Sequence, residues 1–242
     1  MGALVFNVTT AALMVLMFKG GLSLLGEGTL RQRRTPWAAI GLTTLVIAGL
    51  VTQLTWSAAT DTFDSDPART GWWRIATSVF MQNGGPAGDA WNIATIAVIA
   101  ALAEWFWGGP LMLGLFTAGI LLPTYVDMLF GQSERSADPR NFAGSSGATY
   151  FLAATLAAPL LLRVLRTGGI GAHTKDALLA LGVPVLGLAL WFAQSNGHGL
   201  VAAYGFALGA VTCLVARPAA LRPDADRRSG AVEGEREAVR EA

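Results

Sequence analysis

Long apolar stretches divide the sequence into segments of membrane-spanning length. The stretches that lack Asp, Glu, Lys and Arg are residues 1–18, 35–60, 105–126, 141–162 and 177–216. A helix needs about 20 mostly apolar residues to cross a bilayer. Each stretch therefore predicts at least one membrane-spanning helix.

Two further features complete the count of spans. Polar and small residues at Ser195–Gly199 interrupt the last stretch, which therefore predicts two helices joined by a tight turn. Residues 90–103 are too short to span alone, but they continue through Glu104 into the aromatic run at 105–107. We expect six spans from about residue 36 onward, preceded by an extra N-terminal one, and hence an all-α polytopic membrane protein.

Composition supports this fold class. The chain of 242 residues is 53% apolar and only 14% charged, too few charges to cover a soluble domain of this size. Residues 217–242 hold twelve of the 33 charges, six of each sign. The expected organisation is an N-terminal helix with a basic linker (1–35), a six-helix core (36–216) and a charged, disordered tail (217–242).

The basic residues orient the spans. If residues 19–34, 163–176 and the tail face the cytoplasm, thirteen of the seventeen Lys and Arg residues lie inside. Residues 1–18 lack a basic n-region, which disfavours a cleaved signal peptide and favours an extra helix with its N-terminus outside. An interfacial helix is the alternative for this segment.

Composition also excludes several kinds of site. A single cysteine, Cys213, rules out an internal disulfide, and two histidines are too few for a His-rich metal site. No Gly-rich phosphate loop or basic-aromatic stripe is present. We therefore expect no metal, no cofactor and no nucleic-acid partner.

Candidate catalytic residues lie at the outer ends of three predicted helices. Ser146, flanked by glycines, and His198 begin helices from the same face at similar depth, and a base can activate a serine nucleophile. Asn92 begins another span at this face, where its amide can donate to a developing oxyanion. Each residue also has a simpler reading, in helix packing for the small residues and in helix capping for His198 and Asn92.

Several motifs together resemble the rhomboid family of intramembrane serine proteases, over residues 36–216. Gly144-Ser145-Ser146-Gly147 matches the family's Gly-x-Ser-Gly motif, and Tyr150 matches the aromatic residue beside the active site. Trp73-Arg74, followed by Thr77, matches the signature of the first loop. Asn92, Glu104 and Gly108 reproduce the spacing of the second core helix.

The resemblance implies a Ser146–His198 catalytic dyad that hydrolyses peptide bonds in or near transmembrane segments of membrane proteins. It implies that Asn92 and the backbone N–H of Ser146 bind the oxyanion. The substrate would contact Gly144 and Tyr150. A structural role is implied for the remaining motif residues, Trp73, Arg74, Glu104 and Gly205. The expected location is a bacterial cell membrane, with the site toward the outer face and the C-terminus in the cytoplasm.

Two departures from the family pattern leave an alternative open. Gly88 stands where the family often has a histidine that helps bind the oxyanion. In the last helix, Val201 replaces the first glycine of His-x-x-Gly-x-x-x-Gly, and the other register puts Ala202 in place of the histidine. We favour His198, because position 202 lies about 6 Å deeper along a helix. The alternative is an inactive rhomboid-like protein that binds transmembrane helices. An unrelated transporter is disfavoured, because the chain has no repeated halves.

Overall fold

The computed structural model describes residues 2–66, 70–129 and 143–216, and all regular structure in these ranges is helical. Seven helical spans in these ranges are long and apolar enough to cross a membrane. They are α1 (Ala3–Leu25), α2 (Trp37–Thr55), α5 (Gly85–Trp107), α6 (Gly109–Leu129), α7 with α8 (Ser146–Ala154 and Ala157–Arg166), α10 (Thr174–Gln194) and α11 (Gly197–Ala216). The chain is an all-α integral membrane protein, as its hydropathy predicts. The charged tail at 217–242 lies outside the described residues.

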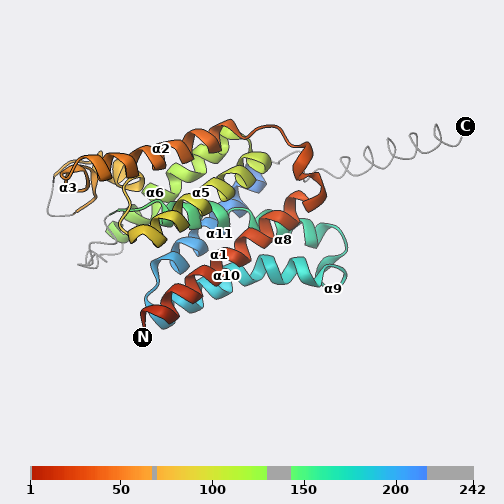
Figure 1. Ribbon diagram of the computed structural model, residues 1–242. Helices are drawn as coiled ribbons and strands as arrows, with labels where there is room; N and C mark the ends of the chain where they lie inside the picture. Colours follow the sequence, from red (N-terminus) through yellow and green to blue (C-terminus); the bar gives the residue numbers. More distant parts are fainter. Residues whose placement is uncertain (1, 67–69, 130–142, 217–242) are drawn as a thin grey trace, which may run out of the picture.

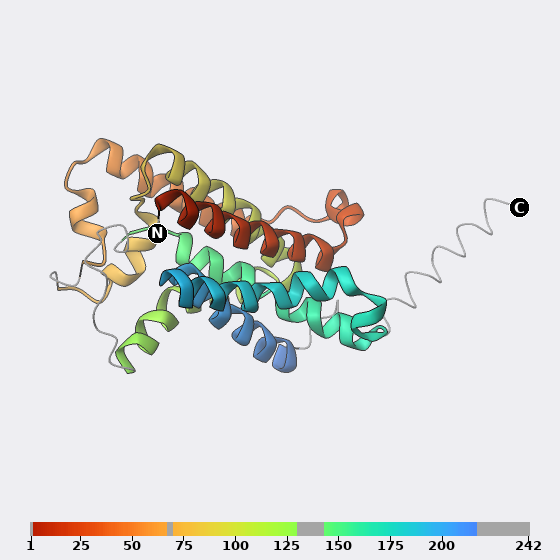
Figure 2. The ribbon, with the colours of Figure 1, turned by 90° about the horizontal axis from the view of Figure 1, so that it is seen from below.

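The serine-bearing span, α7 with α8, occupies the middle of the bundle. It packs against α11, α6, α5, α10 and α1, which surround it in both views (Figures 1 and 2). Its two halves meet at Thr155 and Leu156, and Pro159 lacks the N–H that would continue the helix across this point. The span is therefore enclosed by protein along most of its length.

Glycines allow α11 to approach this central span closely. A Cβ at Gly205 would collide with the carbonyl oxygen of Phe151, and one at Gly209 would collide with that of Thr155. Phe151 lies in α7, and Thr155 directly follows it, so both carbonyls belong to the serine-bearing span. Only residues without a side chain permit backbones to pack this tightly in a membrane bundle.

The extra N-terminal helix belongs to the same bundle. Helix α1 lies between α5 and α10, and it also touches α7 and α8 (Figure 2). Leu13 and Met17 of α1 are fully buried. The helix runs to Leu25, beyond the predicted end at residue 18, because Arg163 of α8 donates to the carbonyls of Ser23 and Leu24 near its C-terminus at 3.0 Å.

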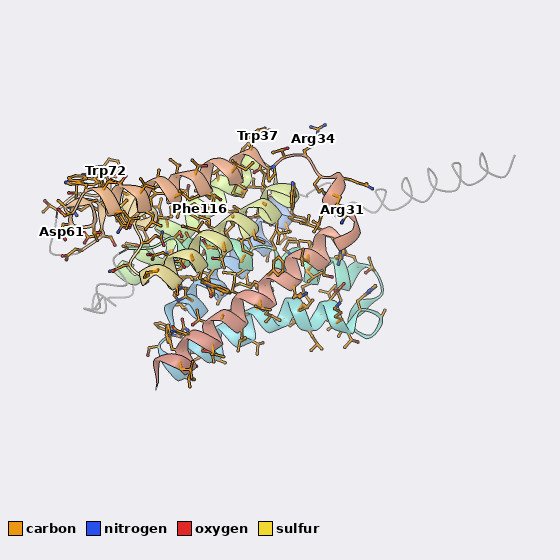
Figure 3. The ribbon with its side chains drawn as sticks, viewed as in Figure 1. Arg31, Arg34, Trp37, Asp61, Trp72 and Phe116 are labelled. Atoms are coloured by element: carbon orange, nitrogen blue, oxygen red, sulfur yellow. The ribbon has the colours of Figure 1, made fainter. Side chains whose placement is uncertain are left out.

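Short helices fill the connections at the two ends of the bundle. Between α2 and α5 the chain forms α3 (Ala59–Phe63), α4 (Arg74–Thr77) and a 3-10 turn η2 (Ser78–Phe80); η1 (Glu27–Gln32) and α9 (Gly169–Ala172) lie at the other end. Figure 3 shows Asp61 and Trp72 at one end, with Arg31 and Arg34 at the opposite one. The basic connections therefore share one end of the bundle.

The predicted break in the final apolar stretch is confirmed. Helix α10 ends at Gln194, Ser195 takes a left-handed conformation with φ of 50°, and α11 begins at Gly197. The hairpin reverses the chain within two residues. It thereby places His198 in the first turn of α11.

Candidate functional site

Ser146 is the first residue of α7, at the end of the bundle opposite the basic connections. Gly144 precedes it with φ of 131°, a conformation that favours glycine. The N–H of Gly144 donates to the carbonyl of Ser78 at 3.0 Å, which ties this turn to the segment between α2 and α5. The turn thus delivers Ser146 to the N-terminus of a buried helix while leaving its side chain partly exposed.

His198 faces Ser146 from the first turn of α11. Its Nε2 lies 3.0 Å from Oγ of Ser146, within hydrogen-bonding distance. When the imidazole carries its proton on Nδ1, Nε2 accepts from the serine hydroxyl, which is the geometry of a nucleophile and its base. The structure thus brings together the two residues that the sequence singles out.

Tyr150 lies one turn after Ser146 and packs against the imidazole. The ring centroids of Tyr150 and His198 are 4.6 Å apart, at an interplanar angle of 60°. The tyrosine is only 2% exposed. Its ring therefore limits where the imidazole can turn.

Asn196 was missed by the sequence reasoning, although an asparagine two residues before a histidine at a helix start is a capping pattern. Its side-chain Oδ1 accepts the backbone N–H of His198 at 3.0 Å, so Asn196 is the N-cap of α11. The residue is fully buried. The cap fixes the backbone from which the imidazole projects.

The alternative register of the last helix leaves no base near the serine. Ala202 is fully buried one turn below His198, and a methyl group can neither accept nor donate a proton. Gly205 lies deeper still, where α11 crosses α7 at Phe151. The pairing with Ser146 is made by His198.

Two helix N-termini meet at the pair. The first N–H groups of α7 and of α11 have no partner within their own helices, and the helix dipoles add partial positive charge there. Negative charge on Oγ of Ser146, or on an oxygen bound beside it, is favoured at such a place. The arrangement suits a reaction that develops an oxyanion.

Asn92 was expected to begin its helix, but α5 begins at Gly85, so Asn92 lies two turns further along, where it is joined to Gln82. Its Nδ2 donates to Oε1 of Gln82 at 2.8 Å. Gln53 of α2 holds the backbone of Gln82 through two hydrogen bonds, at 2.7 and 2.9 Å. Gln82 is 5% exposed, and its Nε2 has no hydrogen-bond partner among the described residues. Gln82 therefore places a second amide beside Asn92, whereas Gly88 offers no side chain.

Trp73 and Arg74 hold the segment between α2 and α5. The Arg74 guanidinium donates to Oδ1 of Asp64 and to the carbonyls of Asp61 and Asp64, each at 3.1 Å. It also stacks on the Trp73 ring, with 5.1 Å from Cζ to the centroid. These contacts hold the segment together, and none of them involves Ser146 or His198.

Glu104 meets the N-terminus of α2. Its Oε2 accepts the backbone N–H of Ala39, in the first turn of that helix, at 2.7 Å. A carboxylate is favoured at a helix N-terminus, and the bond satisfies a donor that the helix leaves free. Glu104 thereby has the partner that an intramembrane carboxylate requires.

No cluster of three or more His, Cys, Asp or Glu residues that could hold a metal ion occurs in the described ranges. Comparison with protein-family models, with curated proteins and with solved structures finds no match for the chain. What the site does must therefore be inferred from its own geometry.

Proposed function

We propose that the protein is an intramembrane serine endopeptidase of the rhomboid type. The observation that carries this proposal is the 3.0 Å separation between Oγ of Ser146 and Nε2 of His198. Both residues are partly exposed at the first turns of two membrane helices, where water and an unwound peptide can reach them. A pair with only a packing role would gain nothing from this exposure.

The reaction begins with proton transfer from Ser146 to Nε2 of His198 as Oγ attacks a peptide carbonyl carbon. The new C–O bond converts the carbonyl oxygen into an oxyanion. The backbone N–H of Ser146 supports it, together with the amides of Asn92 and Gln82. The C–N bond then breaks, and the amine leaves with the proton held by His198. Water, deprotonated by His198, hydrolyses the resulting ester and restores the hydroxyl of Ser146.

The substrate in this proposal is a transmembrane segment of another membrane protein. The partly exposed pair lies at the end of a bundle embedded in the lipid bilayer, so a peptide bond near the end of a substrate helix can reach it. Gly144 would contact that peptide, whereas Tyr150, which is buried against His198, would act through the imidazole and not on the substrate. In this proposal the site faces the outer side of a bacterial cell membrane and the C-terminus lies in the cytoplasm, an orientation that the positive-inside rule supports.

Labelling with a fluorophosphonate probe tests the proposal. The purified wild-type protein in detergent is expected to form a covalent adduct at Ser146, and Ser146→Ala and His198→Ala are expected to abolish it. Ser145→Ala is the matched control, because Ser145 is adjacent but fully buried. Cleavage of a transmembrane substrate should follow the same pattern. Full cleavage by Ser146→Ala would refute the mechanism.

A second function is favoured by the polar groups around Asn92. Gly88 supplies no donor, and Nδ2 of Asn92 already donates to Gln82. With weak oxyanion support, the chain would act as an inactive rhomboid-like protein that binds transmembrane helices. In that case the folded wild-type protein would resist labelling, and Ser146→Ala would still crosslink to transmembrane segments as the wild type does.

A further inference from the structure

Thr10, on the extra N-terminal helix α1, contacts two residues of the site. Its backbone carbonyl accepts from the hydroxyl of Tyr150 at 2.8 Å. Its Oγ1 accepts from Nδ2 of Asn196 at 2.7 Å. The two partners come from α7 and from the start of α11, which are 46 residues apart in the chain and converge on one threonine.

Both partners of Thr10 hold His198. Asn196 accepts the backbone N–H of His198 with Oδ1 and donates to Thr10 with Nδ2, so one amide links the histidine to α1. Tyr150 packs its ring on the imidazole and sends its hydroxyl to Thr10. The histidine is thus restrained at its backbone and at one face of its ring.

The hydroxyl of Thr10 is itself oriented for this role. It donates to the carbonyl of Phe6 at 2.7 Å, which uses its only proton and leaves its oxygen free to accept from Asn196. Asn196 is fully buried, so its amide has no water to replace a lost acceptor. An unpaired buried donor is strongly disfavoured, and the amide would have to turn and release its cap on His198.

From this geometry we propose that Thr10 is a positioning residue for His198, so that the extra helix α1 completes the catalytic site. The proposal rests on the proteolytic function proposed above. Its chemical content is specific: an acceptor at Oγ1 of Thr10 keeps Asn196 turned toward the backbone of His198. Thr10 itself touches neither the substrate nor the reacting atoms.

The neighbouring Thr9 offers a matched control. Its Oγ1 lies 3.1 Å from Oε1 of Gln194 and shares its single proton between that oxygen and the carbonyls of Val5 and Phe6, so it also joins α1 to α10 near the same end of the bundle. Gln194 precedes the turn, and among the described residues its side chain has no hydrogen bond to Asn196 or His198. Thr9→Val removes a threonine hydroxyl and its bond to another helix, from the same helix α1, without touching the chain of contacts to the histidine.

The test compares the rate of fluorophosphonate labelling in Thr10→Val, Thr10→Ser and Thr9→Val. Thr10→Val keeps the shape of threonine but loses the acceptor, and we expect its limiting rate of labelling to fall by about 10-fold or more, because small displacements of a catalytic base are costly. The probe concentration that gives half the limiting rate should stay unchanged. Thr10→Ser restores the acceptor and should restore the rate, and Thr9→Val should label as the wild type does.

Thermal unfolding of each variant separates positioning from folding. A Thr10→Val protein that unfolds at the wild-type temperature yet labels slowly supports the proposal, and one that labels at the wild-type rate overturns it. If Thr10→Val does not fold, Thr10→Ala decides, because it also removes the Oγ1 acceptor of Asn196 and leaves no polar group in its place. A wild-type labelling rate in that variant would overturn the proposal too. Absence of labelling in the wild type would remove the proteolytic function itself, and the role of Thr10 with it.

Discussion

Replacement of Gly205 by alanine tests how closely the histidine helix must approach the serine helix. A Cβ at this position would overlap the carbonyl oxygen of Phe151 and would lie 3.1 Å from Cβ of Ala154. Phe151 and Ala154 are fully buried in the central span, so neither can move aside without disturbing its neighbours. The strain must therefore be relieved by displacement of α11.

The size of that displacement follows from the contact. A carbon and a carbonyl oxygen in contact lie about 3.3–3.6 Å apart, so α11 has to retreat from α7 by roughly 1 Å. Added to the 3.0 Å between Ser146 and His198, this opens the pair beyond hydrogen-bonding distance. A misplacement of about 1 Å in a catalytic group can cost about 10²-fold in rate. Overpacking of this kind also destabilises by about 1–3 kcal/mol.

The assay is the rate of fluorophosphonate labelling, measured together with thermal unfolding in the same detergent. Gly114→Ala is the control, because a Cβ at Gly114 of α6 meets no atom within 4 Å. We expect Gly205→Ala to label about 10²-fold more slowly and Gly114→Ala to label normally. A Gly205→Ala protein with wild-type rate and stability would show that the close approach of α11 does not set the geometry of the pair.

Two further predictions concern groups outside the pair. Glu104→Ala removes the acceptor of the Ala39 N–H, and it should lower the free energy of unfolding by about 1 kcal/mol while the folded protein labels at the wild-type rate; a slower rate would give Glu104 a role in the site. Gln82→Met keeps the side-chain volume but removes both the Nε2 donor and the Oε1 that accepts from Asn92, and it should slow labelling by about 10²-fold if this pair of amides supports the oxyanion. An unchanged rate would exclude Gln82 from that task.

Hydropathy predicted the spans of the fold because lipid imposes one requirement on every span: enough apolar length with its backbone hydrogen bonds satisfied. It did not predict where helices end. The serine span continues to Arg166, past the predicted end at residue 162, because Arg163 finds carbonyl acceptors on α1 and the carboxylate of Asp176 at 3.2 Å. Such partners come from distant segments and leave no mark in a local pattern.

The residues of the site also differ in how far the sequence could predict them. Ser146 and His198 could be singled out because each begins a helix at the same membrane face, which topology alone determines. The spacing of glycines in α11 could not choose between His198 and Ala202, since that choice depends on how α11 meets α7. The role of Thr10 could not be predicted from the sequence. Its partner Asn196 lies 186 residues away in the chain, and nothing in the sequence around Thr10 indicates that the two meet.

The enclosure of the central span bears on how the protein is made. Of the most apolar part of this span, 78% is buried by other helices, against at most 44% for any other span. Two of its walls, α10 and α11, are synthesised after it. Until α10 and α11 are inserted, the sides of the span that they later cover lack these neighbours. The apolar side chains on these sides stabilise the span in lipid before the bundle is complete. Ser146, at its N-terminus, has no His198 to pair with until α11 is inserted.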